Sequence, residues 1–288
     1  MKSKDINIRD PFVLCENGKY YLYGTRAKDF GKGVGGFDVY ISEDLTDWSE
    51  PVECFNSITY GMNRGVNWAP EVHKYKENYY MFATFTRENG RRGTYILRGQ
   101  SPLGPFEPHS KDAVTPEQWE CLDGTLYTSK EGIPYLVFCH EHEQIIDGTI
   151  CYVELSEELT CSKGEVTTMF CASSSGCADK LPNSSHYVTD GPFLFRTKEN
   201  KLLMLWSTFI KGQYAECVVR FKNHDLGMEF EHLKPLISDD GGHGMIFKKD
   251  DTWMLTYHTP NTSGEEHPVF HELNDIGDGV ELSNRYID

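Results

Sequence analysis

The chain has 288 residues, of which 39% are hydrophobic and 13% aromatic, so it holds enough apolar surface to form a folded core. Acidic residues outnumber basic ones by 44 to 28, which gives a formal net charge of −16. Because like charges repel, this balance argues against nucleic acid and anionic membrane surfaces as partners and favours a neutral substrate.

Two features predict a cytoplasmic protein. The opening segment, MKSKDINIRDPF, lacks the apolar stretch of a signal peptide, and no segment approaches the roughly 20 apolar residues of a membrane helix. The nine cysteines are scattered and form no Cys-x-x-Cys pair, which is typical of reduced thiols. A secreted protein whose leader has been trimmed is the alternative.

One phrase recurs along the chain: a polar residue, a short apolar run, a polar turn, and a second run of aromatic and aliphatic residues. This order predicts a β-hairpin each time. In chain order, the phrases begin at Asp10 (DPFVLCENGKYYLYGT), Glu71 (EVHKYKENYYMFATF), Asp123 (DGTLYTSKEGIPYLVF), Asp190 (DGPFLFRTKENKLLMLWST) and His243 (HGMIFKKDDTWMLTYHT).

Further strand-like segments follow each hairpin, and no segment shows a sustained helical period. These segments are 37–52, 93–108, 149–160, 214–233 and 268–288. The most loop-like stretch, 171–185, precedes the fourth hairpin. We expect it either to overhang a ligand site or to be a plain surface insertion.

The repeat predicts an all-β fold, a five-bladed β-propeller that occupies residues 1–288 as one domain. Hairpins that recur at intervals of roughly 50 to 70 residues are each too small to bury a core alone, which is typical of propeller blades. The innermost strand of every blade lines a central channel. We therefore expect the five polar residues that begin the phrases, called the anchors below, to converge on one space.

Converging carboxylates predict acid–base chemistry. Carboxylates held together in a partly desolvated pocket do not all ionise, so one becomes an acid while another stays a base. Cleavage of a glycosidic bond needs this division. Aspartates that only cap turns are the alternative reading, because Asp before Gly or Pro is common in turns.

At this point the chain resembles glycoside hydrolase family 43. The resemblance rests on RDPFVL, NWAPEVH, LDGTLY and DGPFLF in the first four repeats and on GGHGMIF in the fifth. It extends over nearly the whole chain. It implies a five-bladed propeller and an inverting glycosidase, typically acting on α-L-arabinofuranosyl or β-D-xylosyl linkages.

The resemblance also implies catalytic roles. Asp10 matches the general base, and Asp123 matches the aspartate that orients the acid and tunes its pKa. Asp190 stands in the place of the general acid, where the family usually has Glu, so its carboxyl is one methylene shorter. Glu71 is the rival for the acid.

Other residues are expected to bind substrate or an ion. The resemblance implies a Ca²⁺ or Na⁺ ion in the channel near His243; a neutral, hydrogen-bonded histidine is the alternative. Trp68 and Phe12 are each expected either to pack against a sugar ring or to pack between blades.

Arg9 and Arg26 are expected to bind sugar hydroxyls or to neutralise the carboxylates. Glu71, if it is not the acid, is expected to bind substrate. The run His140-Glu141-His142 has the spacing of a strand, and we interpret it as polar residues near the rim of the pocket.

These observations predict an exo-acting, inverting glycosidase that removes arabinofuranosyl or xylosyl units from plant-polysaccharide oligosaccharides. An exo-β-galactosidase and an endo-arabinanase are alternatives on the same scaffold. A retaining fructan-type hydrolase would use Asp10 as nucleophile. A non-catalytic sugar-binding propeller is the remaining alternative.

Overall fold

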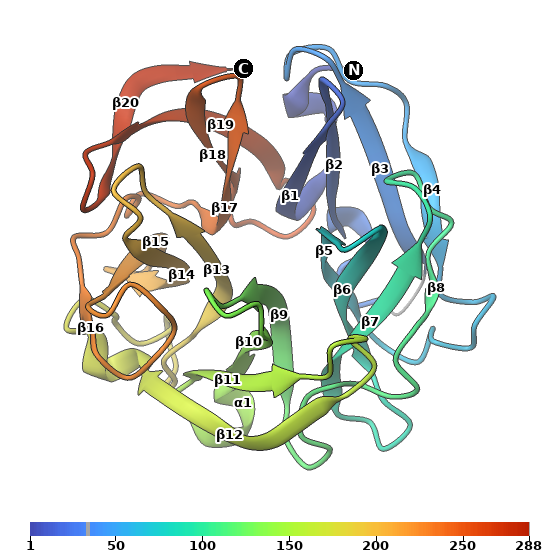
Figure 1. Ribbon diagram of the computed structural model, residues 1–288, viewed down its shortest axis with the longest axis horizontal. Coiled ribbons are helices and arrows are strands. Elements are labelled where there is room, and N and C mark those ends of the chain that lie inside the picture. Colours follow the sequence, from blue (N-terminus) through green and yellow to red (C-terminus); the bar gives the residue numbers. More distant parts are fainter. Residues whose placement is uncertain (33–34, 288) are drawn as a thin grey trace.

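The computed structural model describes residues 1–32 and 35–287, which form five four-stranded antiparallel sheets arranged around a centre (Figure 1). Each sheet uses four strands that are consecutive in the sequence, so each is one blade. The first strands of the blades contact one another in a ring, β1 against β5, β5 against β9, and so on round to β17 against β1. The prediction of a five-bladed β-propeller is confirmed.

The strands are grouped here by blade. Blade one holds β1 (Ile8–Glu16), β2 (Lys19–Arg26), β3 (Gly36–Ser42) and β4 (Val52–Asn56); blade two holds β5 (Asn67–Tyr75), β6 (Asn78–Thr86), β7 (Arg92–Gly99) and β8 (Glu107–Pro108); blade three holds β9 (Cys121–Thr128), β10 (Pro134–His140), β11 (Thr149–Leu155) and β12 (Ser162–Cys171); blade four holds β13 (Asp190–Arg196), β14 (Leu202–Ile210), β15 (Gln213–Phe221) and β16 (Phe230–His232); blade five holds β17 (Gly242–Lys249), β18 (Thr252–Thr259), β19 (His267–Asp275) and β20 (Val280–Ile287).

Helices are short in the described part of the chain. The α-helix α1 (His142–Ile145) links β10 to β11, and 3₁₀ turns occupy η1 (Ser3–Asp5), η2 (Ala27–Asp29) and η3 (Ala172–Ser175). None of the described helices has the length and apolar character needed to cross a bilayer.

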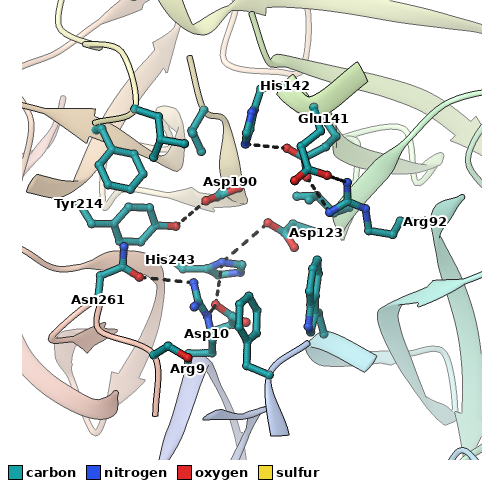
Figure 2. Close-up of a pocket in the computed structure, with 18 residues that line it drawn as sticks. Arg9, Asp10, Arg92, Asp123, Glu141, His142, Asp190, Tyr214, His243 and Asn261 are labelled. Atoms are coloured by element: carbon teal, nitrogen blue, oxygen red, sulfur yellow. Dashed lines mark hydrogen bonds and ion pairs between the residues drawn. The ribbon is translucent and has the colours of Figure 1, made fainter. Parts of the chain in front are cut away.

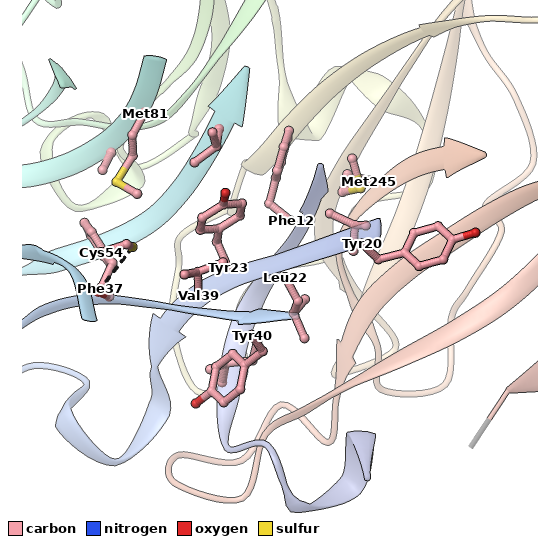
Figure 3. Close-up of a cluster of buried hydrophobic side chains, with 14 of the residues drawn as sticks. Phe12, Tyr20, Leu22, Tyr23, Phe37, Val39, Tyr40, Cys54, Met81 and Met245 are labelled. Carbon is pink, nitrogen blue, oxygen red and sulfur yellow. Dashed lines mark hydrogen bonds between the residues drawn. The ribbon is translucent and has the colours of Figure 1, made fainter. Parts of the chain in front are cut away.

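Apolar side chains between neighbouring blades form the core. Between blades one, two and five, Phe12, Leu22 and Met81 pack with Met245 in one cluster (Figure 3). Burying each such side chain contributes about 1.5–3 kcal/mol, so the blades hold one another in place and fix the strands that line the centre.

A β-bulge interrupts the first strand of every blade. In each, the pairing with the second strand shifts its register around one residue with a left-handed backbone. These residues, the bulge positions, are Asp10 (φ 55°), Ala69 (φ 46°), Asp123 (φ 55°), Gly191 (φ 48°) and His243 (φ 53°). Bulges re-aim side chains and are common beside active sites.

Each bulge is tied to the blade before it. The backbone N–H of Ala69 donates to Thr25 Oγ1 (2.7 Å), and that of Asp123 donates to Thr84 Oγ1 (3.0 Å). The acceptor on the second strand of blade four is Ser207, which accepts from His243. Gly191 is the exception, since its N–H donates to the Asp123 carboxylate instead.

The bulges correct one part of the sequence interpretation, which placed five anchors at equivalent positions. Asp10, Asp123 and His243 do occupy the bulge position, but Asp190 lies one residue before it and Glu71 two residues after it. The residues that precede the bulge, the pre-bulge positions, pair with equivalent residues of the second strands. They are Arg9, Trp68, Leu122, Asp190 and Gly242.

The ring closes between blade five and blade one without a shared strand in the described residues. Side chains join this seam instead. The Asn7 amide donates to the carbonyls of Gly264 (3.0 Å) and Glu266 (2.9 Å), and His258 Nδ1 accepts the backbone N–H of Asp10 (3.2 Å). Asp10 is therefore both a closing residue of the ring and a residue of its centre.

Candidate active site

A pocket of about 410 Å³ opens at the centre of the ring and receives side chains from all five blades (Figure 2). Three of the predicted anchors with carboxylates, Asp10, Asp123 and Asp190, line it together with His243. Four of the five pre-bulge positions also line it: Arg9, Trp68, Leu122 and Asp190. The bulges thus bring the functional side chains of separate blades to one space.

Asp10 is held as an ion. Its carboxylate lies 3.1 Å from His243 Nδ1 and 3.4 Å from Arg9 Nε, and it accepts a 2.6 Å hydrogen bond from the Thr25 hydroxyl. Burial favours the protonated acid, but these partners outweigh it and hold the pKa of Asp10 well below its usual value. An ionised carboxylate at neutral pH can accept a proton.

Asp123 differs from Asp10 although it occupies the same position in its blade. It accepts the backbone N–H of Gly191 (3.1 Å) and lies 3.8 Å from His243 Nδ1. Burial raises the pKa of Asp123 to about 7, and the charges of Asp190 and Asp10 add to the rise, while His243 opposes it.

Asp190 enters the pocket from the start of β13. The Tyr214 hydroxyl donates to its Oδ2 at 2.9 Å. Burial raises the pKa of Asp190, and His243 and the Tyr214 hydrogen bond act against this rise. The next residue, Gly191, leaves room for the His243 ring, because a Cβ there would lie 2.7 Å from its Cδ2.

The sequence did not indicate that the carboxyl of Glu141 lies deep in the site. It follows β10, is only 4% exposed, and lines the pocket. Its carboxylate lies 3.2 Å from Arg92 Nη1 and 3.1 Å from His142 Nε2. Burial raises the pKa of Glu141 to about 8, with Arg92 opposing and Asp190 assisting.

The run His140-Glu141-His142 was the signal for this group. Its interpretation as a strand was wrong for His142, which begins α1 after β10 has ended at His140. His140 turns away and stacks on Trp119 at 4.2 Å, whereas His142 and Glu141 both line the pocket. Arg92, Tyr214, Asn261 and Phe30 are other lining residues that no repeat position indicated.

Two stacked aromatic rings form part of the pocket wall. Trp68 stacks on Phe30 with ring centroids 4.9 Å apart, and both line the pocket. The Arg9 guanidinium lies over the Phe30 ring at 4.3 Å and pairs with Glu266 at 3.2 Å. Flat apolar faces beside charged, hydrogen-bonding groups suit a sugar ring, which carries C–H faces and hydroxyl edges.

Three predicted residues do not line the pocket. Phe12 is buried in the interblade core, in edge contact with Phe193 at 6.1 Å. Glu71 pairs with His73 at 2.9 Å because it lies two residues beyond the bulge. Arg26 pairs with Asp38 of β3 at 2.6 Å. Direct substrate contact at these three places stays a prediction that the pocket geometry does not favour.

A channel cation near His243 also stays a prediction. His243 Nδ1 faces the Asp10 and Asp123 carboxylates. Burial lowers the pKa of His243, but the charges of Asp10 and Asp123 outweigh this effect and raise it. Ca²⁺ and Na⁺ prefer oxygen ligands, so a histidine nitrogen is a weak ligand for either ion. Among residues 1–32 and 35–287, no group of three or more His, Cys, Asp or Glu is placed to hold a metal ion.

The arrangement supports acid–base chemistry on a bound ligand. One carboxylate is kept ionised on one side, while two carboxyls with raised pKa values, Asp190 and Glu141, lie across the pocket from it (Figure 2). Environments that separate carboxyl pKa values in this way identify a base and an acid.

Comparison with known proteins gives a consistent result. The family model described as Glycosyl hydrolases family 43 matches residues 5–275. A solved endo-arabinase from Bacteroides thetaiotaomicron is 36% identical, with a TM-score of 0.86 over 95% of this chain and 96% of that one. No curated protein matches the chain.

More distant structures share the fold. An endo-1,4-beta-xylanase from Bacteroides thetaiotaomicron is 22% identical, with a TM-score of 0.77 over 98% of this chain and 96% of that one. An alpha-L-arabinofuranosidase from Lactobacillus brevis is 14% identical, with a TM-score of 0.72 over 99% of this chain and 100% of that one.

Proposed function

Because the chain belongs to the glycosyl hydrolases family 43, we propose that it hydrolyses arabinofuranosyl or xylosyl linkages in oligosaccharides from plant polysaccharides, with inversion. The observation that carries this proposal is the separation of carboxyl states in one pocket: Asp10 ionised, and Asp190 and Glu141 with raised pKa values. Inverting hydrolysis needs one carboxylate as base and one carboxylic acid on the other side of the sugar.

The base in this proposal is Asp10. It takes a proton from a water molecule as that water attacks the anomeric carbon, and His243 and Arg9 hold its carboxylate in place. The acid is one of the two carboxyls across the pocket, Asp190 or Glu141. Trp68 and Phe30 give the sugar ring an apolar surface to pack on.

Arabinofuranosyl is the favoured sugar. The support is the 36% identity to an endo-arabinase over nearly the whole of both chains, whereas the solved xylanase and arabinofuranosidase, at 22% and 14%, share the fold only. The wider group of similar structures also includes a beta 1,3 galactosidase, so galactosides belong among the substrates to be tested.

The experiment is a panel of aryl α-L-arabinofuranosides, β-D-xylosides and β-D-galactosides with short arabino- and xylo-oligosaccharides. We expect turnover of the arabinosides, reduced by about 10²–10⁴-fold in Asp10→Asn, the loss typical of a removed general base. Asp47→Asn is the matched control, because that carboxyl is 72% exposed, pairs with Lys2 and does not line the pocket.

The outcomes separate the alternatives. Turnover that Asp10→Asn leaves intact contradicts the proposal. Proton NMR of the first product anomer distinguishes inversion from retention, and retention would favour a fructan-type mechanism with Asp10 as nucleophile. Binding of arabino-oligosaccharides without turnover would identify a sugar-binding propeller.

A further inference from the structure

Glu141 occupies a rigid and buried place at the pocket. Its backbone N–H donates to the carbonyl of Glu120 (2.9 Å), and its own carbonyl accepts from Gln144 in the first turn of α1 (3.0 Å). Because both backbone groups are tied, the side chain is aimed into the pocket from a fixed base. It lies there beside Arg92 and His142, across from Asp10 (Figure 2).

We propose that Glu141 is the general acid, and that it gives its proton to the leaving oxygen of the glycosidic bond. This inference rests on the proposed glycosidase function and assigns to blade three a role that the family resemblance places at Asp190 in blade four. The side chain of Glu141 is also one methylene longer than that of Asp190, which is the length that the family usually has in its acid.

The groups around Glu141 keep it protonated. Asp123 of β9, Asp190 of β13 and Glu143 of α1 are acidic neighbours that oppose its ionisation. Arg92 of β7, a cation that faces it, is shared with other carboxylates, Glu120 at 3.1 Å and Glu143 at 2.5 Å. Arg92 therefore stabilises the Glu141 anion after proton transfer without preventing protonation before it.

Asp190 is arranged differently. The Tyr214 hydroxyl donates to its carboxylate, and His243 and Arg9 lower its pKa relative to burial alone. A donor fixed on the carboxylate favours the ionised form. In this arrangement Asp190 positions substrate through its other carboxyl oxygen, and its ionised form opposes ionisation of Glu141.

A histidine pair connects Glu141 to the edge of the pocket. His142 Nε2 faces the Glu141 carboxyl, and its Nδ1 lies 3.1 Å from His186 Nδ1 on the half-exposed 171–189 segment. Burial lowers the pKa of His142, so it is neutral at pH 7 and can pass a proton between its two nitrogens. This pair can return a proton to Glu141 after each turnover.

The proposed hydrolysis moves one proton at each of the two carboxyls. Water loses a proton to the Asp10 carboxylate while its oxygen bonds to the anomeric carbon; the glycosidic C–O bond breaks, and the leaving oxygen takes the proton of Glu141. The products are a sugar with inverted configuration and an alcohol. Asp10 then releases its proton to solvent, and Glu141 regains one through His142.

The test compares Glu141→Gln with Asp190→Asn on aryl glycosides of the turned-over sugar that carry a dinitrophenolate or an unsubstituted phenolate, and on an oligosaccharide. For Glu141→Gln we expect a loss of about 10²–10⁴-fold on the oligosaccharide and the phenolate, and near-normal turnover of the dinitrophenolate, which needs no proton to leave. Asp190→Asn should slow all three substrates alike.

The pH profile is a second readout. Wild-type turnover of the oligosaccharide should fall as the pH rises through the pKa of Glu141, about 8, because the ionised group has no proton to give. Glu141→Gln should lack this limb. Asp47→Asn, whose carboxyl is 72% exposed and does not line the pocket, is the control and should keep both the limb and the leaving-group pattern.

The outcomes are distinguishable from failure of the proposed function. If wild type turns over no glycoside, the glycosidase proposal itself fails. If wild type is active and the leaving-group-dependent loss occurs in Asp190→Asn but not in Glu141→Gln, the acid is Asp190 and the present inference is overturned. Circular dichroism of each variant checks that the sheets are intact.

Discussion

At the scale of single residues, Glu216 shows how burial couples stability to pH. This side chain of β15 is 0% exposed; its Oε2 accepts from Ser207 (3.0 Å) and from the Gly244 N–H (2.8 Å), while Oε1 has no partner in the described residues. Burial raises the pKa of Glu216 to about 8, with only the Gly244 and Ser207 bonds and His243 opposing.

This raised pKa predicts a pH-dependent stability. An unfolded Glu has a pKa of about 4.3, so the contribution is fully present below that pH and is lost as the pH rises towards 8, by up to about 1.4 kcal/mol per unit. Glu216→Gln stays neutral and should flatten this slope, with a gain in unfolding free energy at pH 8 that is absent near pH 4. Urea unfolding at both pH values measures it; an equal effect at both would contradict it.

Residue patterns located three of the anchors in the pocket but did not indicate that Glu141 lies there. Asp10, Asp123 and His243 could be located because each begins a recurring hairpin phrase. Glu141 begins no hairpin: it reaches the pocket through the turn from β10 into α1, and a three-residue run of polar side chains holds no information on where that turn aims them. The pKa separation depends on burial and neighbours from several blades, which no local pattern contains.

At the scale of elements, the bulge in β13 makes a specific demand for glycine. Gly191→Ala should lose about 1–3 kcal/mol to strain at φ 48° and should also push a methyl group into the His243 ring. Because His243 holds the Asp10 carboxylate, turnover should fall as well. Gly212→Ala is the control, with φ 78° but only Pro182 nearby at 3.9 Å.

The measurements are thermal unfolding and turnover of both alanine variants. Equal stability losses with equal turnover would show that the His243 contact has no consequence. A larger loss of both quantities in Gly191→Ala is the expected result.

The sequence patterns of the strands predicted the blades but not the register in which the strands pair. Alternating apolar runs around turn residues predicted all five hairpins, because those preferences are local. The offset of Glu71 was not predictable: Ala69 takes the left-handed position in β5, so a hairpin that looks equivalent in sequence presents Trp68 to the pocket and turns Glu71 to His73.

At the scale of the whole molecule, the seam between blades five and one lies beside β1, the strand that carries Asp10 and Arg9 of the proposed active site. Asn7→Ala removes two hydrogen bonds across this seam, to Gly264 and Glu266, and should cost about 1–3 kcal/mol. Because Asp10 and Arg9 lie on the same strand, activity should be lost at a lower urea concentration than β-sheet content.

Asn78→Ala is the control for the seam, since Asn78 bonds to Arg98 within blade two. Turnover and circular dichroism followed along the same urea series compare the two variants. Coincident loss of activity and sheet content in Asn7→Ala would show that the seam has no special role.

At the bulge positions, the backbone bonds that hold the ring together are made by different atoms from those that the side chains present at the centre. Each bulge is held by its backbone N–H, so the side chain it presents takes no part in that bond: two blades present a carboxylate there, one an imidazole, one a methyl group and one only hydrogen. Four of the five bulge side chains can therefore be exchanged without loss of the acceptor that holds a neighbouring bulge. Asp123 is the exception, because its carboxylate accepts the backbone N–H of Gly191 in the next blade. A new reaction can thus be assembled by single substitutions at the other four positions, whereas a substitution of Asp123 also changes the support of blade four.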